Sequence, residues 1–147
     1  IGAKRIETRS WATAYRGPLA IHAGAGLGPV GGWRGLAQLT MSQPFKAALE
    51  DGAARGLVPA YDEELPRGAI VATCELIGIR PIGIEQNGDA TILADDMISF
   101  TPILGNERAF GDYTPGRWAW LLADVKPLAE PIPAKGALGL WNWEGQL

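Results

Sequence analysis

The apolar run in residues 68–79 constrains the fold of this chain more than any other part of its sequence. The apolar side chains of this run are Ala69, Ile70, Val71, Ala72, Cys74, Leu76 and Ile77. Such a run is too continuous for one of its faces to meet water. We therefore predict a strand in the middle of a sheet, covered on both faces.

Four further strands are expected around this central one. They lie at residues 4–11, 18–23, 117–128 and 137–143. The first and the last show the period of two that is typical of a strand, and the strand at 117–128 is rich in Trp and Leu. Pro127, Pro131 and Pro133 are expected to break the chain after it, because proline donates no backbone hydrogen bond.

One helix has a clear pattern, at residues 44–55. Ser42 can cap it, Pro44 fits its first turn, and its apolar stripe ends before Gly56. A weaker pattern indicates a short helix near residues 94–100. The six glycines of residues 24–35 predict a surface loop, since their spacing does not fit a phosphate-binding loop. An acidic loop is expected at residues 57–66.

These elements predict an α+β fold in a single domain that spans residues 1–147. The expected strands are separated by long irregular connections, with only one or two helices between them. A small mixed β-barrel with one or two peripheral helices is the natural closure of such a sheet.

Composition narrows the classes of function. The chain has 147 residues and a net charge of −3, which argues against a protein that coats long duplex DNA. It has one cysteine and one histidine, so we expect no disulfide, no metal and no cofactor, and a reducing cytoplasmic setting fits. No apolar stretch is long enough to span a membrane, so no membrane partner is expected. The sequence is compatible with any oligomeric state.

Charged residues gather near the N-terminus. Lys4, Arg5, Glu7, Arg9 and Arg16 place four cations and one carboxylate in a short span. Neither side of the expected strand at residues 4–11 is apolar. One interpretation is a solvated edge strand whose charges discourage edge-to-edge pairing, with Glu7 and Arg9 as an internal ion pair. The other is a wall that binds an anion or a nucleotide.

Aromatic side chains and other polar groups allow a structural or a functional interpretation. Trp11 and Tyr15 suit stacking on an exposed base, or packing in the core. Tryptophans at 118, 120, 141 and 143 favour packing, and His22, in an apolar strand, favours a structural role over a catalytic one. Asp95 and Asp96 favour helix capping over a divalent cation.

The N-terminal segment also resembles a known signature. Residues 2–9 read Gly-Ala-Lys-Arg-Ile-Glu-Thr-Arg and fit the G-x-K-x-x-E-x-R pattern of the ASCH domain, a branch of the PUA-like superfold. The segments at 9–11, 15–23, 68–72, 110–113, 116–120 and 136–141 also resemble that family, with residues 24–65 as an insertion. The resemblance implies that the first strand of a PUA-like barrel is missing before Ile1.

The resemblance implies a basic cleft that receives RNA or a modified nucleoside. Its ligand-binding residues would be Lys4, Glu7, Arg9, Trp11, Tyr15 and Arg16. Some similar proteins are ribonucleases or remove the acetyl group of N4-acetylcytidine, which makes Lys4 and Glu7 candidate catalytic residues of an alternative, hydrolytic function. In the amidohydrolase branch a threonine stands where this chain has Glu7, and Thr8 is expected on the opposite face of the strand.

The period of the strand makes one more geometric prediction. Lys4 and Glu7 are an odd number of residues apart, so their side chains start on opposite faces of an ideal strand. We therefore expect the charged ends of Lys4 and Glu7 to lie beyond hydrogen-bond reach when no ligand is bound.

Overall fold

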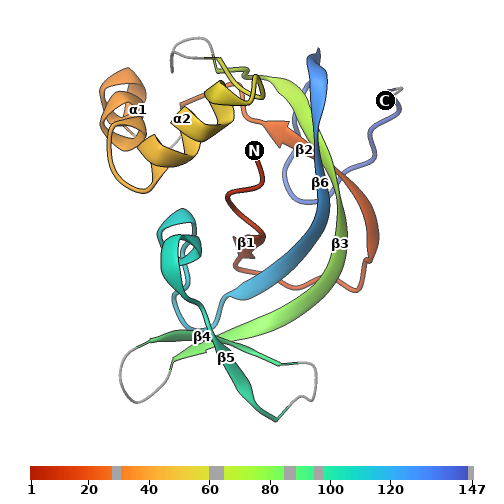
Figure 1. Ribbon diagram of the computed structural model, residues 1–147. Coiled ribbons are helices and arrows are strands. Elements are labelled where there is room, and N and C mark those ends of the chain that lie inside the picture. Colours follow the sequence, from red (N-terminus) through yellow and green to blue (C-terminus); the bar gives the residue numbers. More distant parts are fainter. Residues whose placement is uncertain (28–30, 60–64, 85–88, 95–97, 146–147) are drawn as a thin grey trace. The chain divides into compact units, whose positions relative to one another are not determined.

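The computed structural model is an α+β fold built on a six-stranded sheet (Figure 1). It describes residues 1–27, 31–59, 65–84, 89–94 and 98–145. The strands are β1 (Ile6–Arg9), β2 (Gly17–Ala23), β3 (Ala69–Ile84), β4 (Ala90–Leu93), β5 (Phe100–Pro102) and β6 (Trp118–Pro133). The helices are α1 (Gly32–Thr40), α2 (Phe45–Ala54) and the 3-10 helix η3 (Gly105–Phe110).

The strands follow the order β1-β6-β3-β4-β5, and β2 pairs with β3 outside this path. β1 runs antiparallel to β6, with Glu7 opposite Trp120 and Thr8 opposite Ala119. β4 runs antiparallel to β3 on one side and to β5 on the other. The described strands therefore form an open path with β1 and β5 at its ends.

β3 occupies the central place that its apolar run predicts. Ile70, Ala72, Cys74 and Leu76 alternate as buried positions along it, as the period of two requires. The expectation that neither face meets water is wrong at Ile77, whose side chain is 61% exposed. One face of β3 is thus covered more completely than the other.

The chain divides into two compact units, each made of two segments. The first unit comprises residues 1–18 and 75–125, and the second comprises residues 19–74 and 126–147. In the first unit the buried cluster consists of Ile82, Ala90, Ile103, Tyr113 and Ala119, with Ile6, Ile92 and Leu121 packed against it. In the second unit α1 contacts α2. The assignment of one domain with an insertion at 24–65 stays a prediction.

Several predicted elements are confirmed. β2 and α2 match the expected bounds closely, and β1 lies within the expected strand at 4–11 but starts at Ile6. Pro44 rather than Ser42 takes the N-cap position of α2, and the Ser42 hydroxyl instead donates to the Leu39 carbonyl at 2.7 Å. The Ser42 cap is therefore wrong, although the helix itself is confirmed.

Helix α1 corrects the prediction of a loop across the glycine-rich segment. It begins at Gly32, after Gly31 and Gly32 adopt the left-handed conformation that glycine allows. Beyond Gly35 its residues are ordinary helix formers, with Leu36 and Leu39 three apart on one face. Gly31 and Gly32 therefore mark the start of a helix that packs on α2, whereas residues 24–27 are irregular chain as predicted.

Strand β6 corrects the prediction that prolines break the chain after residue 128, since it continues to Pro133. Pro127, Pro131 and Pro133 are all exposed and all have odd numbers. Alternate residues of a strand direct their N–H groups toward the same edge, so the three missing donors lie along one edge. The even-numbered residues of this stretch keep their N–H donors. Just beyond the strand, the Ala134 amide donates to the Gly68 carbonyl at 2.9 Å.

The strand predicted at residues 137–143 is wrong. Residues 137–143 form bends and irregular chain, and Leu138 is fully exposed. Gly139 has a φ of 73°, a left-handed conformation that interrupts an extended strand. The alternation in the sequence therefore does not correspond to a buried face.

The segment after β3 also differs from expectation. Ser99 and Phe100 are not helical, and Phe100 begins β5, so the helix expected near 94–100 is wrong in its described part; residues 95–97 lie outside the described residues. Residues 60–64 of the expected acidic loop also lie outside the described residues. Within the described part of the chain, no helix has the length and apolar character needed to cross a membrane.

Candidate functional site

Lys4, Glu7 and Arg9 come together as one ionic cluster, which we call the Glu7 cluster. Lys4 Nζ lies 2.6 Å from Glu7 Oε2, and Arg9 Nε lies 3.2 Å from Glu7 Oε1. The side chains of Lys4 and Glu7 are each 33% exposed and that of Arg9 is 51% exposed. The cluster is thus preformed and accessible to solvent.

The contact between Lys4 and Glu7 contradicts the predicted separation of their charged ends. The prediction assumed an extended strand from residue 4, but β1 begins only at Ile6. Lys4 precedes the ladder, so the strict alternation of side chains does not apply to it. The interpretation of Glu7 and Arg9 as an internal ion pair is confirmed.

Glu107, on η3, holds the chain in place just before β1. Its Oε2 accepts the amide of Arg5 at 2.9 Å, and its Oε1 accepts the amide of Ile6 at 3.1 Å. The Tyr113 hydroxyl donates to the same Oε1 at 3.1 Å. One carboxylate therefore fixes the direction in which Lys4 leaves the strand. The sequence carries no signal for this role, because about a hundred residues separate the partners.

Thr8 lies on the opposite face of β1 from Glu7, as predicted, and it is also buried, which the sequence did not predict. Its hydroxyl accepts the Asp112 amide at 3.2 Å, and its carbonyl accepts Arg117 Nη2 at 3.2 Å. A Cβ on Gly111 would lie 2.9 Å from the Tyr113 ring and 3.2 Å from the Thr8 methyl. The hydroxyl of Thr8 is therefore enclosed on the face opposite the Glu7 cluster.

Asp112 and its neighbours stabilise the turn that follows. The hydroxyl and amide of Thr114 donate to Asp112 Oδ1 at 2.6 and 3.1 Å, and together with the positive charge of Arg117 they lower the pKa of the Asp112 carboxyl. Arg117 Nε lies 3.3 Å from Asp112 Oδ2. These contacts have a structural role in the turn.

The three remaining predicted site residues have partners of their own, that of Trp11 on β6 and those of Tyr15 and Arg16 within their own segment. The Trp11 ring, 36% exposed, packs edge-to-face on Trp120 at 4.7 Å, and its carbonyl accepts Trp120 Nε1. The Tyr15 hydroxyl donates to the Pro18 carbonyl at 2.6 Å. Arg16 donates to the carbonyls of Thr13 and Tyr15 at 3.0 and 2.7 Å. Among the described residues, ion pairs join Lys4, Glu7 and Arg9 to one another and not to Trp11, Tyr15 or Arg16.

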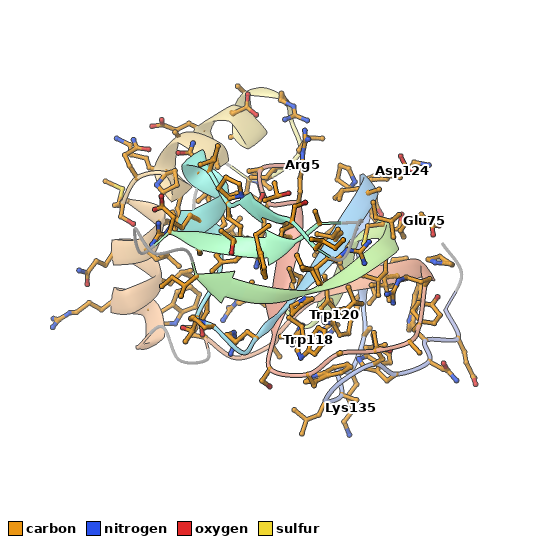
Figure 2. All side chains as sticks on the ribbon, turned by 90° about the horizontal axis from the view of Figure 1, so that it is seen from below. Arg5, Glu75, Trp118, Trp120, Asp124 and Lys135 are labelled. Atoms are coloured by element: carbon orange, nitrogen blue, oxygen red, sulfur yellow. The ribbon has the colours of Figure 1, made fainter. Side chains whose placement is uncertain are left out.

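The other aromatic and imidazole groups have packing roles. Trp120 of β6 (Figure 2) is buried, which confirms its prediction as a packing residue. His22 Nε2 donates to the Ala134 carbonyl at 2.9 Å, and its ring lies edge-to-face with Trp141 at 5.9 Å. A Cβ on Gly136 would lie 2.7 Å from the His22 ring. The structural interpretation of His22 fits this enclosed geometry.

The described residues contain no group of three or more His, Cys, Asp or Glu side chains that could hold a metal ion. Asp95 and Asp96, where the sequence favours helix capping over a divalent cation, lie outside the described residues.

Tyr113 gives a pH-dependent prediction. Burial raises its pKa above the usual value of 10.0, and the charges of Glu107 and Glu7 raise it further. In the folded state Tyr113 thus stays neutral at a pH where the unfolded chain ionises it, and the stability it contributes is present below pH 10 and lost as the pH rises. Between pH 10 and 11 we expect the free energy of unfolding to fall by up to about 1.4 kcal/mol more in the wild type than in Tyr113→Phe.

Chemical denaturation of both proteins from pH 8 to pH 11 measures this difference. The two profiles should run in parallel from pH 8 to 9, which serves as the internal control. Profiles that stay parallel above pH 10 would show that Tyr113 ionises as easily in the folded chain as in the unfolded one.

No protein-family model matches this chain, and no curated protein matches its sequence.

Proposed function

We propose that this chain is an ASCH-type, PUA-like module that binds RNA or a modified nucleoside through Lys4, Glu7 and Arg9. The observation that carries the proposal is the Glu7 cluster itself: the signature residues meet within 2.6 and 3.2 Å on the accessible side of β1. Two cations on one carboxylate leave a positive excess that attracts a ligand with negative charge. The proposal includes the small β-barrel of the PUA-like superfold as the architecture of this module.

An enzyme acting on the same ligand is the second candidate. The contact between Lys4 and Glu7 supports an enzymatic function, because a cation and a carboxylate within hydrogen-bond reach can stabilise an oxyanion and activate water. In the amidohydrolase branch, the threonine at the position of Glu7 would be the nucleophile. Thr8 is buried and its hydroxyl accepts the Asp112 amide, so Thr8 does not take that role here. In an enzyme, Lys4→Ala should lose turnover of N4-acetylcytidine or RNA yet keep binding, whereas a binding module should lose affinity.

Binding to short single-stranded RNA should depend on salt only moderately. The Glu7 cluster can contact few phosphates, so we expect about two to four released counterions, and a slope of log K against log salt of about −1.4 to −2.8. Arg9→Ala should weaken binding more than Arg16→Ala, because the Arg16 guanidinium is occupied by carbonyls of its own turn. Fluorescence anisotropy at several salt concentrations measures both effects.

Arg55→Ala is the matched control for Arg9→Ala. Arg55 is 52% exposed and pairs with Asp51 at 2.9 Å, much as Arg9 is 51% exposed and pairs with Glu7 at 3.2 Å. Removal of Arg55 should leave RNA affinity unchanged. Equal losses in both variants, or a much steeper salt slope, would place binding elsewhere on the chain.

A further inference from the structure

Each carboxylate oxygen of Glu7 already faces a cation. Glu7 Oε2 contacts Lys4 and Glu7 Oε1 contacts Arg9. Each oxygen keeps a second lone pair, but a ligand donor, such as the amino group of a base, would have to approach it beside the positive charge of Lys4 or Arg9. The carboxylate therefore acts within the protein, as the group that holds the two cations at a fixed spacing.

The free side-chain donors of the Glu7 cluster belong to its two cations. Arg9 uses only Nε toward Glu7, so the outer edge of its guanidinium stays available on a half-exposed side chain. Lys4 has three donors on its ammonium and places one against Glu7. Arg5, just before β1 (Figure 2), has an exposed side chain that is without an ion-pair partner among the described residues.

The backbone near the Glu7 cluster offers little to a ligand. The amides of Arg5 and Ile6 are both bonded to Glu107. Three cations against Glu7 leave a positive excess, which Glu107 reduces but does not cancel. A group that fits such a surface accepts hydrogen bonds through several oxygens and carries negative charge.

We infer that the Glu7 cluster recognises the phosphate group of its ligand and not the base, with Glu7 as a positioning residue that never contacts the ligand. The inference deepens the proposed function and rests on it. A phosphate would accept from the outer edge of Arg9 and from Lys4, with Arg5 as a third cation. Glu7 is then not expected to accept hydrogen bonds from the amino edge of a base.

Calorimetric or NMR titration with three probes tests the inference: cytidine, cytidine 5′-monophosphate and inorganic phosphate. The nucleotide should bind at least about tenfold more tightly than the nucleoside, which is the scale of one charge-assisted hydrogen bond. Inorganic phosphate should compete with it. Cytidine that binds as tightly as the nucleotide, or phosphate that fails to compete, would overturn the inference.

The probes separate the inference from the proposed function. Binding of RNA without competition by phosphate would overturn the inference and leave the function standing. Binding of inorganic phosphate that is lost in Arg9→Ala, without binding of any nucleotide or RNA, would support the phosphate site and overturn the proposed function. Failure of all probes and of RNA would overturn both.

Glu7→Gln gives the sharpest contrast, because it keeps the shape of the side chain and removes its charge. If Glu7 only positions the cations, Glu7→Gln should change the affinities for the nucleotide and for inorganic phosphate by the same factor, while Arg9→Ala should lower both about tenfold. A loss of nucleotide affinity in Glu7→Gln with no loss of phosphate affinity would show that the carboxylate contacts the base, and would overturn the inference. Arg9→Lys, which keeps the charge and loses the planar edge, should weaken binding, and wild-type affinity in it would contradict the inference.

Discussion

Leu76→Ala is expected to lower the free energy of unfolding by about 2–5 kcal/mol, the usual range for a buried leucine. Leu76 lies in the middle of β3, which pairs between β6 and β4 in the sheet. Only 1% of Leu76 is exposed. Its removal loses the transfer free energy of the side chain and leaves a cavity. Since a domain of this size is stable by about 5–15 kcal/mol, the change is a large part of the total.

Ile77→Ala is the matched control, because it removes a similar side chain from the next position of the same strand. Ile77 points to the other face and is 61% exposed, so we expect a loss below about 1 kcal/mol. Urea denaturation followed by tryptophan fluorescence measures both variants. Equal losses would mean that both faces of β3 are buried to the same degree, as the apolar run alone suggests.

The pair also shows what an apolar run can and cannot predict. The run predicted β3 as a central strand, because apolar side chains on both faces of a strand need cover whatever the order of the strands. It did not distinguish Leu76 from Ile77, which are equally apolar but lie on faces with different cover. The cover of each face comes from segments far away in the chain, and a local pattern holds no information on them.

The missed elements share a related cause. β4 and β5 are short, and they exist because they pair with β3 and with each other, through contacts such as Ile82 opposite Ile92 and Leu93 opposite Phe100. The strand expected at residues 137–143 shows the reverse case, since its alternation is good but Gly139 turns the chain. Pairing partners and backbone dihedrals decide these segments more than their side chains do.

The candidate site likewise has a part that the sequence predicts and a part that it does not. Lys4, Glu7 and Arg9 lie within six residues of one another, so their grouping could be predicted from the sequence, and only their exact contacts depended on where β1 begins. Glu107 could not be predicted, because a glutamate in a turn-rich segment has no sequence pattern that links it to the amides of Arg5 and Ile6. Local charge defines the cluster, and a distant residue fixes its backbone.

Glu107→Ala is expected to have the second largest effect, a loss of about 1.5–3 kcal/mol in the free energy of unfolding, the scale of a hydrogen bond to a charged group. The variant removes the partner of two amides and of the buried Tyr113 hydroxyl. Water can replace the bond at the exposed Arg5 amide, whereas the Tyr113 hydroxyl is left unpaired inside the first unit. Glu50→Ala, on the exposed side of α2 with only a 3.7 Å pair to Lys46, should change stability by less than about 0.5 kcal/mol.

Glu107→Gln separates the role of the two carboxylate oxygens. A glutamine has one acceptor oxygen, and in its better orientation that oxygen keeps Ile6 and Tyr113 while the amide nitrogen faces the Arg5 N–H. Hydrogen exchange should therefore quicken at the Arg5 amide and change less at Ile6, and nucleotide affinity should fall as Lys4 loses its fixed direction. Unchanged exchange at Arg5 together with wild-type stability would show that Glu107 does not hold the start of β1, and that the Glu7 cluster forms without it.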